Sequence, residues 1–181
     1  MPFLKTAIPD LLLFEPRLFE DERGYFYESF NQKEFREASS IDLPFVQDNH
    51  SFSKYGVIRG LHFQKPPHEQ AKLIKVVQGE IYDVVVDLRK NSTTFGKWLG
   101  FYLSAQNKKQ LYVPRGFAHG FVVLSPTAEV LYKCDNFYAP QSEGGVIFDD
   151  KTLAINWLLE RNQLLVSEKD LKLPTFSELY P

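Results

Sequence analysis

Cysteine is nearly absent from this chain of 181 residues, since Cys134 is the only one. A lone cysteine excludes an intrachain disulfide framework and a zinc site built from several cysteines. Long hydrophobic runs are missing as well, and stretches such as residues 11–14 are far too short to span a membrane. The first ten residues lack a basic segment leading into an apolar run. We therefore expect no signal peptide, a cytoplasmic location and no membrane partner.

The chain also lacks an excess of positive charge, because 21 Lys and Arg stand against 23 Asp and Glu. This balance argues against a nucleic-acid partner, since proteins that bind nucleic acids usually carry a basic surface. A small anionic ligand needs only a few local Arg and Lys side chains, so it stays compatible with the composition. The length and an apolar content of 44% predict one globular domain over residues 1–181.

Aromatic residues are abundant, with 16 Phe and 9 Tyr, and they favour β-structure because their side chains pack well on pleated surfaces. Residues 73–77 and 80–88 are strand-like, and Gln78 and Gly79 between them predict a hairpin with a two-residue turn. Further predicted strands cover residues 97–103, 110–113, 118–124 and 128–138. Many short strands separated by turns predict an all-β sandwich or barrel.

Helical patterns are few. Asn31, with Glu34 three residues later, predicts a helix start and a short helix that ends near Ser39. Residues 151–162 are compatible with a second short helical piece.

A polar pattern within one predicted strand stands out. Alternation over residues 81–87 puts Asp83 and Asp87 on the same face as Ile81 and Val85. A carboxylate on a partly apolar face needs a partner or a wet cavity. Two interpretations follow: an outward polar face, or the inside of a barrel that holds a polar ligand.

Four histidines are candidates for acid–base chemistry near neutral pH: His50, His62, His68 and His119. Taken alone, each is more often structural or at the surface. The segment 114–119 has the spacing P-x-G-x-x-H, which resembles the second motif of the cupins, small double-stranded β-barrels. Metal-binding cupins carry an H-x-H pair in the first motif, and here Gln64 takes the place of the second histidine. An amide is a poor ligand for Zn²⁺ or Fe²⁺, so we expect no metal.

Several segments, in order along nearly the whole chain, resemble the dTDP-4-dehydrorhamnose 3,5-epimerases. They are residues 21–28, 59–64, 66–67, 70–72, 84–87, 95–96, 113–120, 132–133, 138–140 and 167–170. The resemblance implies an all-β double-stranded β-helix (a cupin or jelly-roll barrel) with a few short helices. It also implies a homodimer and a reaction without a cofactor. In that reaction dTDP-4-dehydro-6-deoxy-D-glucose becomes dTDP-4-dehydro-L-rhamnose through enolates formed at C3 and C5.

The resemblance also implies roles for individual residues. His62 would be the base, oriented by Asp170, and Tyr132 the acid on the opposite face of the sugar. Lys72 would stabilise the enolate oxygen. The other positions that match the substrate-binding site are Arg23, Glu28, Gln47, Asn49, Arg59, His119, Tyr138, Glu143 and Lys169. Among these, Arg23 and Arg59 would hold the diphosphate and Tyr138 would stack on the thymine. We add the hypothesis that His119 polarises the ketone with Asp83 as its partner.

Two local features bear on this assignment. Arg59 and His62 have opposite parity, so both can face a cavity only if a bulge or kink occurs at Gly60. On the predicted strand 128–138, alternation puts Tyr132 and Tyr138 on one face. Phe137 stands where the family commonly has a second tyrosine, which concerns the base-binding end rather than the chemistry.

Three alternatives remain at this point. A related epimerase that inverts only C3 or only C5 shares the same motifs. A metal-dependent cupin is a different class of enzyme, and Gln64 argues against it. A sugar-nucleotide binding protein without activity would be expected to lack the set of His62, Tyr132 and Asp170, yet all three are present.

Overall fold

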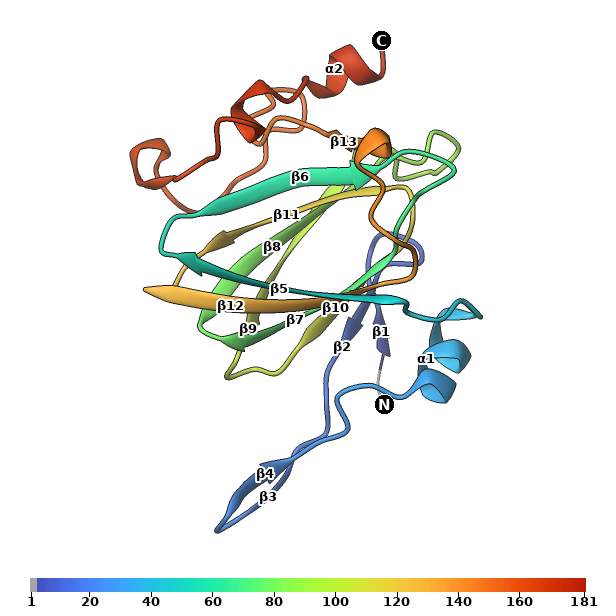
Figure 1. Ribbon diagram of the computed structural model, residues 1–181, viewed down its shortest axis with the longest axis vertical. Coiled ribbons are helices and arrows are strands. Elements are labelled where there is room, and N and C mark those ends of the chain that lie inside the picture. Colours follow the sequence, from blue (N-terminus) through green and yellow to red (C-terminus); the bar gives the residue numbers. More distant parts are fainter. Residues whose placement is uncertain (1–2) are drawn as a thin grey trace.

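Antiparallel β-structure dominates the molecule, a computed structural model that describes residues 3–181 (Figure 1). One sheet has six strands in the order β1-β2-β10-β7-β12-β5, and the facing sheet has five in the order β13-β6-β11-β8-β9. The six strands are β1 (Phe3–Lys5), β2 (Leu12–Phe14), β10 (Gln110–Val113), β7 (Lys72–Gln78), β12 (Thr127–Cys134) and β5 (Gln47–Lys54). The other five are β13 (Glu143–Gly145), β6 (Ile58–Gln64), β11 (Phe117–Val123), β8 (Glu80–Asp87) and β9 (Trp98–Ser104). The predicted all-β barrel with few helices is confirmed.

In the part of the chain that the structure describes, helical structure is confined to short pieces. The helix α1 (Gln32–Ser39) begins where predicted, and the Asn31 side chain accepts hydrogen bonds from the backbone N–H groups of Lys33 and Glu34. The remaining pieces are α2 (Phe176–Leu179) and the 3₁₀ turns η1 (Pro140–Ser142), η2 (Arg161–Gln163) and η3 (Asp170–Lys172). The helical piece predicted over residues 151–162 is largely wrong, since only the start of η2 falls there. Within residues 3–181, no helix has the length and apolar character needed to cross a membrane.

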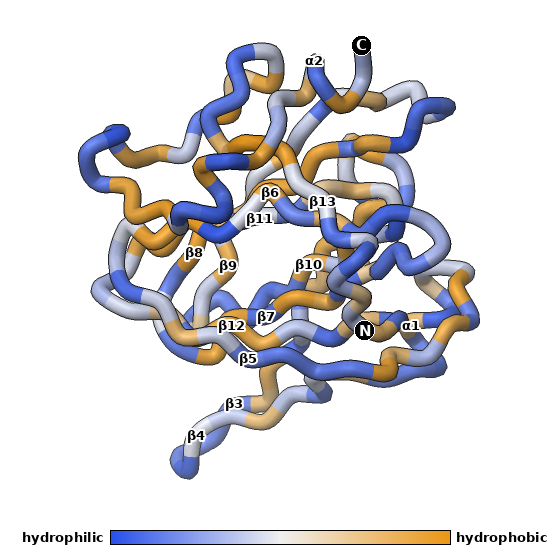
Figure 2. Tube along the Cα trace, turned by 45° about the horizontal axis from the view of Figure 1, so that its top comes forward, coloured by the Kyte–Doolittle hydropathy of each residue, from blue (hydrophilic) through white to orange (hydrophobic). Residues whose placement is uncertain are grey.

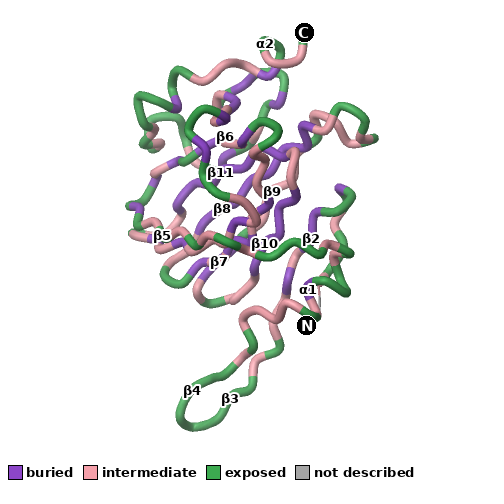
Figure 3. The backbone as a smooth tube through the Cα atoms, turned by 45° about the vertical axis from the view of Figure 1, so that its right-hand side comes forward, coloured by how far each residue is buried: buried purple, intermediate pink, exposed green. Residues whose placement is uncertain are grey.

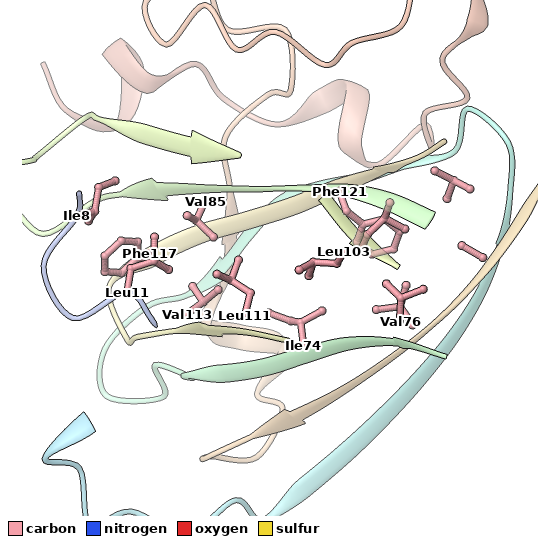
Figure 4. Packing of buried hydrophobic residues seen from close by; sticks show 14 residues of the cluster. Ile8, Leu11, Ile74, Val76, Val85, Leu103, Leu111, Val113, Phe117 and Phe121 are labelled. Atoms are coloured by element: carbon pink, nitrogen blue, oxygen red, sulfur yellow. The ribbon is translucent and has the colours of Figure 1, made fainter. Parts of the chain in front are cut away.

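The hydrophobic core fills one part of the space between the sheets. Figure 4 shows Ile74 and Val76 of β7 facing Val85, Leu103 and Phe121 of the opposite sheet. A second cluster packs the C-terminal segment, including Phe148 and Trp157, against the outer face of the five-stranded sheet. A third lies under α1 around Phe35. Hydrophobic and hydrophilic stretches follow one another along the strands around the barrel (Figure 2). These strands also carry buried polar side chains, among them Asp83 and His119.

The predicted hairpin over residues 73–88 is wrong. Both strands exist, but β7 pairs with β10 and β12, whereas β8 pairs with β11 and β9 in the facing sheet. The chain passes from one sheet to the other at Gly79, which has φ 76°. A Cβ at this position would lie 2.1 Å from the carbonyl oxygen of Thr127, so only glycine fits. A glycine such as Gly79 is suited both to a tight hairpin turn and to a connection between two facing sheets. The sequence pattern therefore does not distinguish the two.

The predicted strand over residues 128–138 is too long, because β12 ends at Cys134. Beyond it the chain binds another segment: Asp135 accepts a hydrogen bond from the backbone N–H of Ala71 at 2.7 Å, and Gln70 donates to the carbonyl of Asn136. These side-chain bonds replace the sheet ladder. Tyr138 therefore lies on a loop, and the prediction that it shares one strand face with Tyr132 is wrong.

A two-stranded arm extends away from the barrel (Figures 1 and 3). It consists of β3 (Phe19–Asp21) and β4 (Gly24–Phe26), and every residue of both strands is exposed. Exposed aromatic side chains on the arm include Phe19, Tyr25 and Phe26. An arm that buries so little against its own chain is a natural surface for contact with another molecule.

Candidate active site

The predicted site residues surround a cavity of about 540 Å³ between the two sheets. Its lining includes Arg59, His62, Lys72, His119, Tyr132, Lys169 and Asp170. A smaller pocket of about 210 Å³ shares His62, Lys72 and Tyr132 with it and adds Gln47, Asn49, Tyr138 and Glu143. Eleven of the thirteen predicted site residues therefore line one of two pockets that share three side chains. The volume of the larger cavity, about 540 Å³, suits a small polar ligand.

Strand β6 supplies two of these side chains through an irregularity. His62 pairs with His119 of β11, but Arg59 pairs with Phe121, so three steps along β6 oppose two along β11. Gly60, with φ 127°, sits at this bulge, and a Cβ there would lie 2.5 Å from the Cα of Gly120. The predicted bulge is confirmed. It resolves the opposite parity, because Arg59 and His62 both line the cavity.

His62 and Asp170, far apart in sequence, meet at the cavity wall. Their Nε2 and Oδ1 atoms are 2.7 Å apart, and the Asp170 side chain is buried. A bridge between Val57 and Leu165 docks the C-terminal segment beside β6, which brings Asp170 to its position. When Nε2–H is donated to Asp170, the lone pair of the neutral ring lies on Nδ1, which can accept a proton.

The electrostatic surroundings keep this imidazole neutral near physiological pH. Burial lowers the pKa of His62 below its usual value, and the hydrogen bond and charge of Asp170 partly oppose that effect. A neutral histidine with an adjacent carboxylate is suited to act as a base and to be stabilised as an imidazolium once protonated.

A second histidine–carboxylate pair lies deeper in the barrel. The Nε2 atom of His119 is 3.0 and 2.9 Å from the two carboxylate oxygens of Asp83, and both residues are buried. The hypothesis that these two residues are partners is confirmed. Of the two interpretations of the polar pattern in β8, the barrel interior is correct for Asp83, which is fully buried and contacts His119 at the cavity. Asp87 is equally buried but is bound by Arg89, Ser92 and Thr94 instead.

The facing wall belongs to the six-stranded sheet. It carries Tyr132 on β12 and Lys72 on β7, with the Lys72 Nζ atom 5.7 Å from the centre of the Tyr132 ring. Burial raises the pKa of Tyr132, an effect that the charge of Arg59 reduces, so the phenol keeps its proton. Burial lowers the pKa of Lys72. A protonated phenol and an amine therefore face the His62–Asp170 pair across the cavity.

A chain of polar contacts lines the mouth. Lys169 Nζ lies 2.7 Å from both carboxylate oxygens of Glu143, and Tyr138 Oη donates to Glu143 at 3.1 Å. The side-chain oxygen of Gln47 accepts a hydrogen bond from the backbone N–H of Tyr138 at 3.0 Å. These contacts fix the Tyr138 loop beside the smaller pocket while half of the Tyr138 residue stays exposed, 52% by area.

Gln64, which replaces a histidine of the metal-binding motif, supports this loop. Its oxygen accepts a hydrogen bond from Ala139 N at 2.7 Å, and its amide nitrogen donates to the carbonyl of Phe137. The amide is thus engaged with the backbone of the loop.

Two predicted residues lie outside both pockets. Arg23 sits at the tip of the arm with its side chain 85% exposed and paired with Asp21. Glu28, just beyond the arm, is exposed too. Conversely, the cavity includes Ser51 and Ser167, which are absent from the predicted site residues. Ser51 follows Gln47 and Asn49 at the same alternate spacing on β5, so extending that pattern by two residues would have found it.

These features define a cupin-like barrel whose cavity brings a histidine–aspartate pair on one sheet opposite a tyrosine and a lysine on the other, an arrangement typical of proton-transfer enzymes. Comparison with known proteins specifies the reaction. The family model described as dTDP-4-dehydrorhamnose 3,5-epimerase matches residues 5–178, and the chain belongs to this family.

Individual relatives agree over almost the full length. The chain is 55% identical over 171 residues to a dTDP-4-dehydrorhamnose 3,5-epimerase of Shigella flexneri, covering 94% of this chain and 93% of the relative. The crystal structure of the enzyme from Elizabethkingia anophelis NUHP1 is 56% identical with a TM-score of 0.96, covering 98% of this chain and 97% of that one. The Legionella pneumophila enzyme in complex with dTDP-4-keto-L-rhamnose is 46% identical with a TM-score of 0.92, covering 99% and 97%.

The contact between His62 and Asp170 predicts a specific pH dependence. If His62 is the base, it works when neutral, so kcat/KM should fall as the pH drops through the His62 pKa, which burial lowers below its usual value. Because Asp170 raises that pKa, Asp170→Asn should shift the acidic limb to still lower pH and reduce the plateau rate by about 10² to 10⁴.

A pH–rate profile of both proteins measures this effect. The matched control is Asp150→Asn, a change at another buried carboxylate, which accepts backbone N–H groups and does not line the cavity. It should leave the position of the acidic limb unchanged. An unshifted limb in Asp170→Asn would contradict the assignment of His62 as the titrating base.

Proposed function

We propose how this chain performs the 3,5-epimerase reaction, in which dTDP-4-dehydro-6-deoxy-D-glucose becomes dTDP-4-dehydro-L-rhamnose. C3 and C5 of the substrate both flank the C4 ketone, so removal of either proton gives an enolate. Inversion requires the new proton to arrive on the opposite face of the sugar ring. One observation carries the proposal: His62 comes from the five-stranded sheet and Tyr132 from the six-stranded sheet, so the two line the cavity from opposite walls.

Each step moves a proton and no electrons are gained or lost overall, so the reaction is expected to need no cofactor. Neutral His62 takes the proton from C3, and Asp170 stabilises the imidazolium. Lys72 interacts with the enolate oxygen that forms, and removing such a donor typically costs about 10² to 10³ in rate. Tyr132 then donates its phenolic proton to the other face of C3. After both groups re-equilibrate with solvent, the same sequence inverts C5.

Other residues hold the ketone and the nucleotide. We assign His119, oriented by Asp83, to the ketone oxygen beside Lys72. Arg59 contacts the diphosphate, because a guanidinium suits bidentate contact with phosphate oxygens. Its place at the rim is supported by the hydrogen bonds of its side chain to Ser53 and the carbonyl of Phe52.

The base-binding end comprises the smaller pocket. Tyr138 stacks on the thymine, and the polar side chains around it contact the nucleoside. They are Gln47, Asn49, Glu143 and Lys169. The bound product in the Legionella pneumophila relative supports a dTDP-sugar as the ligand.

Substitution of the two reacting residues separates their roles. His62→Ala should lose both inversion and deuterium uptake from D₂O, by about 10² to 10⁴, because no base remains to form the enolate. Tyr132→Phe should lose inversion more than deuterium uptake, since His62 still removes and returns protons on its own face. NMR of substrate and product in D₂O measures both. If His62→Ala exchanged substrate protons at the wild-type rate, His62 would not be the base.

We further propose that residues 1–181 form one catalytic domain that works as a homodimer in the cytoplasm, with the arm of each chain completing its partner's site. Arg23 lies at the arm tip with an exposed guanidinium, and it lines neither pocket of its own chain. Glu28 lies at the base of the arm and would approach the partner's site with it. The exposed aromatic residues of the arm supply apolar surface for such a contact.

Mixing inactive variants tests this arrangement. A mixture of Arg23→Ala and His62→Ala chains, unfolded and refolded together, should recover about a quarter of wild-type activity. Half of randomly formed dimers are mixed, and each has one intact site of two. A mixture of Lys72→Ala and His62→Ala chains is the control and should stay inactive, because both residues line the cavity of a single chain. No recovery in the first mixture would contradict an exchanged arm.

A further inference from the structure

Strand β5 presents a row of polar side chains to the barrel interior. Gln47, Asn49, Ser51 and Ser53 alternate with the exposed residues between them. Three members of the row have hydrogen-bond partners: Gln47 binds Asn49 and the backbone of Tyr138, Asn49 also contacts the Cys134 sulfur, and Ser53 accepts from Arg59. Ser51 is the exception, since its buried Oγ has no hydrogen-bond partner among residues 3–181.

A buried hydroxyl without a partner is unfavourable, so each one in a native protein calls for an explanation, such as an ordered water or a role in binding or catalysis. Ser51 lines the same cavity as His62, Lys72 and Tyr132. Its hydroxyl can rotate without breaking an existing bond in the protein, so a ligand can take up the hydrogen bond with no competition.

The register of β5 against β12 locates Ser51 relative to the residues assigned to the sugar ring and to the diphosphate. Asn49 pairs with Tyr132, the acid, whereas Ser51 pairs with Val130, two residues further along. The next inward residue is Ser53, which holds the side chain of Arg59 at 3.0 Å. Ser51 therefore lies between the position assigned to the sugar ring and the arginine assigned to the diphosphate.

We propose that the Ser51 hydroxyl donates a hydrogen bond to an oxygen of the phosphate that is linked to the sugar. The proposal rests on the function proposed above. A phosphate oxygen is favoured over a sugar oxygen because the ketone is served by Lys72 and His119, while the Arg59 guanidinium draws negative charge to this part of the cavity. A hydrogen bond to a charged oxygen is stronger than one to a neutral group. Ser51 thus fixes the point from which the sugar enters between His62 and Tyr132.

Binding of two nucleotides to Ser51→Ala tests the proposal without relying on turnover. dTDP has the phosphate in question and dTMP lacks it. Titration calorimetry should show dTDP bound about tenfold or more weakly than by the wild type, with dTMP binding unchanged. Ser51→Thr, which keeps a hydroxyl, should recover part of the difference. The ligand-free thermal midpoint of Ser51→Ala should match the wild type, because no hydrogen bond within the described protein is lost.

The possible results separate the alternatives. Equal weakening of dTDP and dTMP would overturn the proposal by assigning Ser51 to the nucleoside. Unchanged binding of both, with a raised KM for the substrate, would overturn it by assigning Ser51 to the sugar ring. A lowered ligand-free midpoint would indicate a structural role instead. If the proposal for Ser51 fails while wild-type protein from the same preparation turns over the substrate, the failure concerns Ser51 alone. If the wild-type protein binds neither nucleotide, that result counts against the proposed function.

Discussion

The distance between two facing β-sheets is the constraint on which this site depends. Where stacked sheets lie about 10 Å apart, interdigitating side chains fill the space between them, as in the hydrophobic part of this barrel. In the polar part a cavity of about 540 Å³ stays open between the sheets and can hold one sugar ring. Because β6 and β12 belong to different sheets, His62 and Tyr132 line the cavity from opposite walls, as the proposed base and acid must in order to meet opposite faces of one ring. An epimerase needs this geometry and a hydrolase or a simple binding protein does not.

A polar cavity inside a barrel has to be stabilised by its surroundings. Here each buried carboxylate has a hydrogen-bond partner, Asp170 in His62 and Asp83 in His119, so the cost of burying it is reduced. The remaining space between the sheets is filled by the hydrophobic cluster around Ile74, Val85 and Leu103. The hydrophobic cluster holds the two sheets in a fixed position relative to one another. The polar side chains on the facing walls of the cavity therefore keep a fixed separation.

Much of this arrangement was predictable from local patterns. The Asn31 cap, the bulge demanded by the parity of Arg59 and His62, and the pairing of Asp83 with His119 all follow from spacing and residue type. The residues named by family resemblance line the two pockets, apart from Arg23 and Glu28. The step between sheets at Gly79 and the end of β12 at Cys134 depend on which distant segments pair. A single sequence does not specify that pairing, so both predictions failed there.

The most direct test of opposed base and acid groups is a single-turnover reaction of the wild-type protein in D₂O, with the product trapped by reduction and examined by NMR. If His62 removes each proton and Tyr132, equilibrated with solvent, returns another from the far side, both C3 and C5 of the first product formed should carry deuterium. Product that retained the original protons at the inverted carbons would mean that one group removes and returns the same proton. That result would contradict the division of roles between the two sheets.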